Sequence, residues 1–176
     1  MPVRRMTLTA LMTALLCVTA PITLPIGPIP LSLTSAVLAL SALLLGTDAA
    51  LCCGLYLLMG LIGLPVFSGF TGGIGVLTGA TGGFILAYLP VTALEGVLLR
   101  RTHRLTAQAA VLLTGTALLH AAGGAWYAAW AGVSAKAALT VCVLPFLPGD
   151  VLKLAAVLSV GRALQGRLRA AGLNAR

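Results

Sequence analysis

An acidic and a basic residue stand three positions apart near the C-terminus, inside the otherwise apolar segment 144–153 (LPFLPGDVLK). If this segment begins a helix, Asp150 and Lys153 share one of its faces. Placing charged side chains in an apolar environment is costly, so the pair predicts a binding site for a polar ligand. Two structural interpretations stay open: Asp150 can cap the helix N-terminus, and Lys153 can snorkel or pair with Asp150.

A second candidate site is the glycine-rich segment 64–84 (LPVFSGFTGGIGVLTGATGGF). Glycine at this density lets the backbone approach a ligand closely and adopt positive φ angles. Phe67, Phe70, Thr78 and Thr81 are interspersed, and apolar platforms beside small polar groups are typical of a small-molecule site. A flexible connector, or glycines that pack helices tightly, is the alternative.

A third feature is a pair of small residues, Ala10 and Ala14, one helical turn apart in the first apolar run. Small residues at this spacing allow another helix to approach closely. They therefore indicate a helix-packing surface.

The composition shows which environment must hold these residues. Of the 176 residues, 60% are hydrophobic and 8% are charged, whereas a soluble domain carries about 25% charged residues. A chain of this size cannot bury so much apolar surface within itself, because a domain of ~150 residues leaves about 30% of its chain surface exposed. The sequence therefore predicts an integral membrane protein and excludes a soluble enzyme, a disordered chain and a disulfide-stapled domain.

Breaks at polar residues, proline and glycine divide the chain into six predicted transmembrane helices. Their expected ranges are 6–20, 33–45, 49–62, 82–99, 105–130 and 149–168. Because Pro145 and Pro148 interrupt an apolar stretch, residues 134–147 are expected to form a broken, partly re-entrant segment leading into the sixth helix. The prediction is an all-α protein with a single transmembrane domain over residues 1–176.

The basic residues predict the orientation. With six spans and a cytoplasmic N-terminus, the arginines near residues 4–5, 100–104 and 162–176 all lie inside, and only Lys136 falls in an outer loop. This bias predicts a multi-pass protein of the cytoplasmic membrane with both termini in the cytoplasm. It accounts for the net charge of +8 without a nucleic-acid partner. The aromatic residues 126, 127 and 130 are expected to form a belt at the outer end of the fifth span.

Catalytic signatures are missing from the sequence. It has no P-loop, no Gly-x-Ser-x-Gly and no His-Glu-x-x-His, and its four cysteines lie in apolar runs without a Cys-x-x-Cys pair. Asp48 and Glu95 are expected to be isolated near the inner face, and His120 to be an interior histidine with satisfied hydrogen bonds. We therefore expect no enzymatic activity, no ATP hydrolysis by this chain, no catalytic residue, no metal and no cofactor.

Three blocks together closely resemble the BioY family, the biotin-binding substrate (S) components of energy-coupling-factor (ECF) transporters. They are residues 56–67 (YLLMGLIGLPVF), 79–84 (GATGGF) and 145–153 (PFLPGDVLK). The resemblance covers essentially the whole chain and keeps the same order. It implies a six-transmembrane-helix bundle whose structured outer loops cap a ligand pocket, and high-affinity binding and uptake of biotin without chemistry on it.

The resemblance also implies partners besides membrane lipid. Ala10 and Ala14 would dock the transmembrane coupling subunit, and two cytoplasmic ATPase subunits would drive transport by toppling the bundle. The alternatives are an S component for a different vitamin and a small membrane enzyme or scaffold.

Biotin carries a ureido group, an apolar thioether ring and a carboxylate, and these define the expected site. Asp150 is expected to accept ureido N–H bonds or organise the site, and Lys153 to neutralise the carboxylate, although the sequence leaves open which of them faces which end. Ring packing is expected from Tyr56, Phe67, Phe84 and Tyr88. Hydrogen bonds from backbone or hydroxyl groups are expected at Gly72, Gly73, Thr78 and Thr81. The chain departs from the family pattern at Thr34, Ala80 and Phe84, where glutamine, proline and tyrosine are usual.

Overall fold

A computed structural model describes residues 3–24 and 29–170 of the chain, and this part is mostly helical. The α-helices are α1 (Val3–Thr19), α2 (Thr34–Leu45), α3 (Ala49–Leu61), α4 (Gly82–Arg100), α5 (Leu105–Ala131), α6 (Ala135–Cys142) and α7 (Leu147–Ala170). Two short 3-10 helices are η1 (Gly46–Asp48) and η2 (Ile74–Thr78). Two-residue strands β1 (Thr23–Leu24) and β2 (Leu31–Ser32) pair antiparallel, with Thr23 opposite Ser32.

Three helical segments of the described chain are long and apolar enough to cross a membrane: Thr34–Leu61, Gly82–Arg100 and Leu105–Ala131. A fourth is possible if the bent pair Ala135–Cys142 and Leu147–Leu168 forms one span. A helix is present in each of the six predicted ranges at nearly the predicted bounds, while three or four segments meet the length and composition expected of a membrane span. α1, with 17 residues, would be about 25 Å long, somewhat shorter than a hydrocarbon core of ~30 Å.

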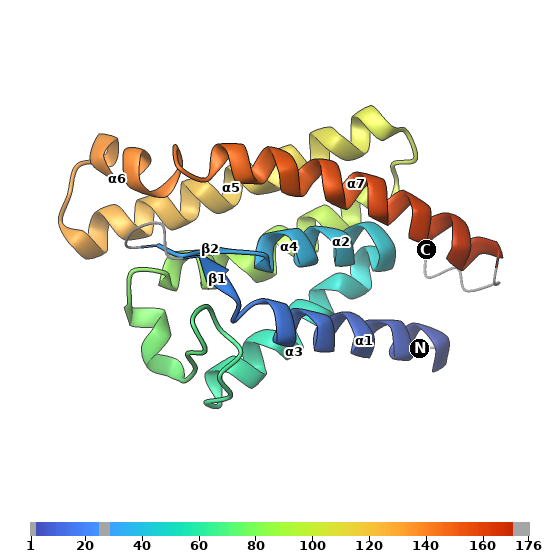
Figure 1. Cartoon of the computed structure of the whole chain (residues 1–176), viewed down its shortest axis with the longest axis horizontal. Coiled ribbons are helices and arrows are strands. Elements are labelled where there is room, and N and C mark those ends of the chain that lie inside the picture. The colour runs from blue at the N-terminus through green and yellow to red at the C-terminus, as the bar shows by residue number, and fades with distance from the viewer. Residues whose placement is uncertain (1–2, 25–28, 171–176) are drawn as a thin grey trace.

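The segment Thr34–Leu61 is long enough for a span by length and composition, but it consists of two helices, α2 and α3, and the chain turns back between them. Gly46 ends α2 with φ 60° and ψ −125°, which is outside the helical region and is accessible mainly to glycine. α2 then packs against α3, which continues the chain after η1. In Figure 1 α3 accordingly runs back toward the end of the molecule where α2 began.

The predicted break before the last helix is present. Ser134 caps α6 by accepting a hydrogen bond from the backbone N–H of Ala137 (3.3 Å). α6 and α7 meet at an angle of 51°. Pro145 lies between them, where its ring and missing N–H prevent a continuous helix. The bend brings the first turn of α7 against α5.

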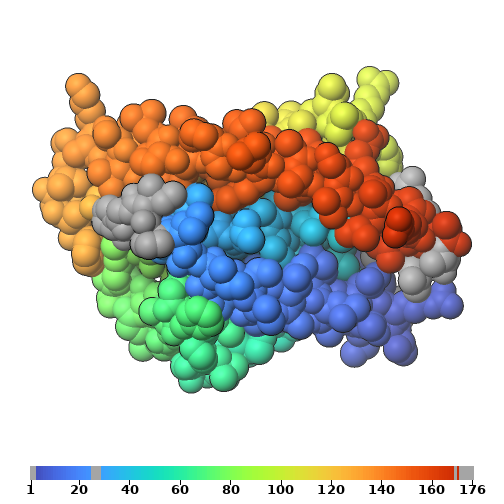
Figure 2. All heavy atoms as spheres, viewed as in Figure 1, coloured from blue at the N-terminus to red at the C-terminus, as the bar shows by residue number. Residues whose placement is uncertain are grey.

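The helices enclose one main apolar core, to which α1, α2, α3, α4, α5 and α7 contribute. Figure 1 shows the N-terminus of α1 and the C-terminus of α7 at one end of the molecule, and α6 with the connection between α3 and α4 at the opposite end. On the face shown in Figure 2, α2 lies between α7 and α1. The Arg-rich turns therefore gather at one end and the glycine-rich connection at the other.

Asp48 is not isolated, contrary to the expectation. Its carboxylate contacts the guanidinium of Arg5 at 2.6 Å and thereby ties the first turns of α1 to η1. The sequence could not show this because 43 positions separate the two residues and only the packing of α1 against α3 brings them together. Glu95 is buried in α4 beside Gly115 of α5, where a side chain on residue 115 would overlap the carboxyl group.

Candidate functional site

A cavity of about 290 Å³ opens between the helices and the α3–α4 connection. This volume is close to the lower end of small-molecule sites, ~300–1,000 Å³. Its polar lining residues are Ser32, Ser35, Ser68, Thr71, Thr81, Thr116, His120, Asp150 and Lys153. Its aromatic lining residues are Tyr56, Phe67, Phe84, Tyr88 and Phe146. The remainder is apolar or glycine, so a ligand with apolar rings and a few polar groups would match it.

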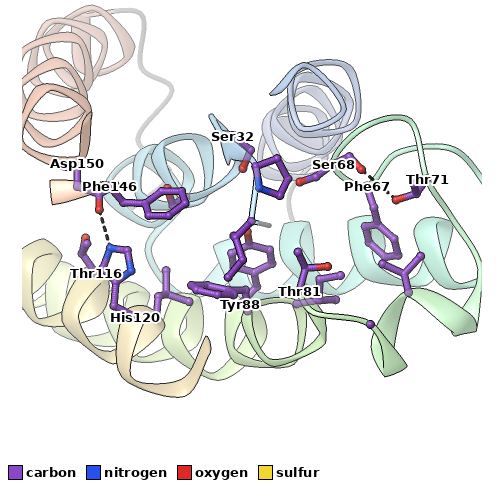
Figure 3. Close-up of a pocket in the computed structure, with 18 of the residues that line it drawn as sticks. Ser32, Phe67, Ser68, Thr71, Thr81, Tyr88, Thr116, His120, Phe146 and Asp150 are labelled. Carbon is purple, nitrogen blue, oxygen red and sulfur yellow. Dashed lines mark hydrogen bonds and ion pairs between the residues drawn. The ribbon is translucent and has the colours of Figure 1, made fainter. Parts of the chain in front are cut away.

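One end of the cavity, here called the charged end, is formed by Thr116, His120 and Asp150 (Figure 3), together with Lys153, which pairs with Asp150. His120 Nε2 lies 2.6 Å from Asp150 Oδ2, and Lys153 Nζ lies 3.3 Å from Asp150 Oδ1. All three side chains are only 13–14% exposed. A carboxylate between a cationic and an imidazole donor satisfies the requirement that buried charges be paired.

Asp150 is not the N-cap residue of α7, which was the first alternative interpretation. α7 begins at Leu147, so Asp150 lies inside the first turn, and its backbone N–H already donates to the carbonyl of Phe146 (2.8 Å). The Asp150 carboxylate contacts side chains of α5 and α7. The pairing of Lys153 with Asp150, which was the second alternative, is present and coexists with a place in the cavity wall.

The other end of the cavity, here called the loop end, is formed by Phe67, Ser68 and Thr71 of the α3–α4 connection (Figure 3). The Phe67 N–H donates to the Thr71 carbonyl (3.0 Å), which closes a tight turn. The Phe67 ring packs edge-on against Tyr56, with centroids 5.5 Å apart. It also lies over Gly60 so closely that a β-carbon there would overlap the ring.

The connection is held to the helices by backbone hydrogen bonds. Gly69 N–H donates to the Pro21 carbonyl (3.1 Å), and Gly73 N–H donates to the Gly60 carbonyl (2.7 Å). Trp126 of α5 donates its indole N–H to the Gly79 carbonyl (3.0 Å). These bonds join the connection to the β1 region, to α3 and to α5, so it is a folded part of the site wall and not a flexible linker.

Trp126 therefore differs from the predicted aromatic belt. Its ring packs over Gly82 and Gly83, where a side chain on either glycine would overlap neighbouring atoms. Tyr127 packs against the cluster around Phe146, and Trp130 is the one of the three with an exposed side chain. Only Trp130 is thus placed as a belt residue would be.

Seven of the ten predicted ligand-binding residues line this cavity, and three do not. The seven are Tyr56, Phe67, Thr81, Phe84, Tyr88, Asp150 and Lys153. Gly72 packs against the backbone of Leu64, and the Gly73 N–H donates to the Gly60 carbonyl. The Thr78 hydroxyl donates to the Gly75 carbonyl (2.8 Å). These three residues shape the connection and do not line the cavity. The sequence could not show this, because an irregular loop has no periodicity that tells which side chains point inward.

His120 is the main lining residue that sequence reasoning did not select. Its Nε2 pairs with Asp150, but its buried Nδ1 has no hydrogen-bond partner in the described part of the chain, so the expectation of satisfied hydrogen bonds holds at one ring nitrogen and not at the other. Its ring also stands near Phe84 and Phe146, with centroid distances of 6.3 Å and 6.1 Å. A histidine is costly to bury in an apolar helix, and this cost could have indicated from the sequence that His120 belongs to a site. Ser32, Ser35, Ser68, Thr71, Thr116 and Phe146 were also missed.

Ala10 and Ala14 lie on the exposed face of α1. Thr9, Met12, Thr13 and Leu16 form its buried face. The two alanines are therefore accessible to another helix and are not among the residues that line the cavity.

The comparisons with known proteins agree with one another. The model of the BioY family matches residues 1–170. The "Probable biotin transporter BioY" of Pyrococcus horikoshii is 35% identical over 167 residues, covering 94% of this chain and 99% of that protein. The "Biotin transporter BioY" of Thermotoga maritima is 32% identical, covering 86% and 89% of the two chains.

Among solved structures, the chain is similar to the S-component for biotin from an ECF-type ABC transporter. The TM-score is 0.88 with 27% identity, and the match covers 93% of this chain and 92% of that one. The relatives are transporters, which agrees with the prediction that this chain is not an enzyme. The chain belongs to the BioY family.

Proposed function

We propose that this chain binds biotin with high affinity in the cavity described above and is the substrate-specific component of an ECF-type importer. The observation that carries the proposal is the Asp150–Lys153 pair in the wall of an aromatic-lined cavity, in a chain whose relatives are named as biotin transporters. No chemistry on the ligand is needed, and the site contributes recognition alone.

The geometry of the pair suits the ureido group of biotin. A ureido group presents N–H donors beside a carbonyl acceptor. Asp150 Oδ1 and Lys153 Nζ, 3.3 Å apart, present an acceptor beside a donor. Charge-assisted hydrogen bonds of this kind are stronger than neutral ones. One flat ureido group can therefore meet both side chains at once.

A carboxylate would match the same place poorly. It would lie against the Asp150 carboxylate, and like charges a few ångströms apart repel each other. The ureido group therefore takes the charged end in our proposal, and the valerate chain extends toward the loop end. This differs from the expectation that Lys153 neutralises the carboxylate, because the two charged groups lie at one end of the cavity. Tyr88 lies between the two ends and Phe146 lies beside His120 at the charged end (Figure 3), and both rings would pack on the thioether ring.

Isothermal titration calorimetry on the purified full-length protein tests the ligand. Biotin should bind saturably and with a stoichiometry of one. Dethiobiotin, which keeps the ureido and carboxylate groups, should compete for the same site, whereas thiamine should not. Saturable binding of thiamine without binding of biotin would assign the chain to another vitamin, and the proposal would be wrong.

The Lys153→Ala variant tests the direction of the ligand. Because Lys153 would donate to the ureido carbonyl, biotin and biotin methyl ester should lose affinity by the same factor, about 10–100-fold for a charged hydrogen bond. A loss for biotin alone would place the carboxylate at Lys153. The apparent melting temperature of the variant controls for folding.

We further propose six spans with the termini in the cytoplasm and the α3–α4 connection capping the site from outside. The bundle would consist of α1 to α5 and the bent pair α6–α7, covered by membrane lipid. The arginine-bearing turns lie at one end of the molecule, and the α3–α4 connection, which contributes to the cavity wall, lies at the other (Figure 1); this supports the arrangement. In intact cells a membrane-impermeant thiol reagent should label Thr71→Cys and not His103→Cys. The opposite labelling would invert the topology.

The partners in this proposal are a transmembrane coupling subunit and two cytoplasmic ATPase subunits, with the coupling subunit docking at Ala10 and Ala14. Replacing both alanines by leucine should leave biotin binding unchanged and reduce uptake in cells that contain those subunits. Leucines at Ala121 and Ala125 are the control, since these exposed alanines have the same spacing on α5. Unchanged uptake by the α1 variant would exclude this docking site.

A further inference from the structure

We propose that this protein also accepts biotin whose carboxyl group has been converted to an amide, including amides that carry an alkyl extension. The inference rests on the proposed function and extends it to a wider class of substrate. It follows from the charges, the hydrogen-bond donors and the opening to the surface that the end of the valerate chain would meet at the loop end of the cavity.

The loop end has no cation to pair with a carboxylate. The sequence contains no lysine or arginine between Arg5 and Arg100, which includes β1, β2, the α3–α4 connection and the start of α4. Of the described residues that line the cavity, Lys153 is the one lysine or arginine, and it belongs to the charged end. Lys136, at the start of α6, is exposed and is not among the lining residues.

Three backbone donors at this end are engaged within the protein, and the neutral hydroxyl of Ser68 can donate to a carboxylate and to an amide carbonyl alike. The N–H of Phe67 donates to Thr71, that of Val76 to Gly73 (3.2 Å) and that of Gly79 to Val76 (3.2 Å). A carboxylate only accepts hydrogen bonds, so it gains nothing from these groups. An amide brings its own N–H, which can donate to oxygens such as Thr71 Oγ1, whose proton is given to the Ser68 carbonyl (3.0 Å).

The loop end also reaches the molecular surface. Thr71 lines the cavity, and its side chain is exposed. A carboxylate at this position stays hydrated, and its replacement by a neutral group removes no buried ion pair. For the same reason a chain attached through an amide can leave the cavity past Thr71 without displacing a wall residue.

Competition against labelled biotin, on the full-length protein in detergent, measures this selectivity. Biotin, biotinamide and biotin coupled through an amide to the lysine side chain should have affinities within about threefold of one another. A site with a charged hydrogen bond to the carboxylate would bind the amides ~10-fold or more weakly, and that result would overturn the inference while leaving biotin binding intact. Binding of none of the three would instead contradict the proposed function.

Two variants sharpen the test. Thr71→Arg supplies a cation at the loop end and should make the protein prefer biotin over biotinamide by about tenfold. Lys136→Ala removes the other cation on this side of the molecule and should leave the ratio of the two affinities unchanged. A ratio that changes in Lys136→Ala would show that Lys136 pairs with the carboxylate, and the inference would be wrong.

Discussion

The two ends of the cavity are built differently. At the charged end the residues come from regular helices: Asp150 and Lys153 follow each other at i and i+3 on α7, and His120 faces them from α5. At the loop end Phe67, Ser68 and Thr71 come from an irregular connection held by backbone hydrogen bonds and close glycine contacts. The helices can fix charged groups precisely, whereas the connection offers shape and an opening to the surface.

This difference predicts that changes at the charged end affect ligand affinity most. Asp150→Ala should cause the largest loss, ~100-fold or more, because it removes the ureido acceptor and leaves Lys153 without its partner. Titration calorimetry measures the loss. Asp150→Asn is the matched control for size, and it should restore part of the affinity by keeping one carbonyl acceptor. Equal affinity of wild type and Asp150→Ala would remove the charged end from the site.

His120 should have the next largest effect, through the orientation of Asp150. His120→Ala frees Asp150 Oδ2 from its 2.6 Å contact and should weaken biotin binding by about tenfold. His120→Gln can still donate an N–H to the carboxylate and should recover most of the affinity. If glutamine and alanine are equally impaired, the role of His120 is packing against Phe84 and Phe146 and not hydrogen bonding.

Gly60 tests the loop end through its shape. Gly60→Ala places a β-carbon into the Phe67 ring, and overpacking of this kind costs about 1–3 kcal/mol of stability. The ring must shift, so we expect a lower melting temperature and a several-fold weaker affinity. Gly54→Ala on the same helix has nothing within 4 Å and is the matched control, expected to be neutral or slightly stabilising. A similar response of the two variants would contradict the close contact at Gly60.

Trp126 should have the smallest effect of the four. Trp126→Phe keeps an aromatic ring over Gly83 and removes the hydrogen bond to the Gly79 carbonyl. The loss of one neutral hydrogen bond corresponds to about 1 kcal/mol. Hydrogen exchange should become faster in the α3–α4 connection and not at the start of α7. Faster exchange in both places would mean that the two ends of the cavity are coupled.

The helices were predictable because their signal is local. Long apolar runs between proline, glycine and arginine breaks predicted α4 and α5 to within one residue of the observed bounds. Pro145 likewise predicted the break before α7. The wall of the cavity was less predictable, since His120 and Asp150 are 30 positions apart and meet only when α5 packs against α7.

The connection between α3 and α4 shows most clearly where prediction of the cavity lining from the sequence fails. Its glycines indicated a candidate site, yet Gly72, Gly73 and Thr78 lie outside the cavity lining while Ser68 and Thr71 lie within it. In an irregular segment no periodicity assigns a side chain to the inside or the outside. The hydrogen bonds from Gly69, Gly73 and Trp126 make that assignment, and they depend on distant parts of the chain.

The sequence by itself determined the membrane environment, the helical segments and the helical face shared by Asp150 and Lys153, because hydrophobicity and helical period act over neighbouring residues. The tertiary structure decided that His120 contacts this pair at the charged end of the cavity. It also decided that the opposite end is formed by a loop without lysine or arginine. Those relations depend on packing between helices and on loop closure, and both join residues that are far apart in the chain.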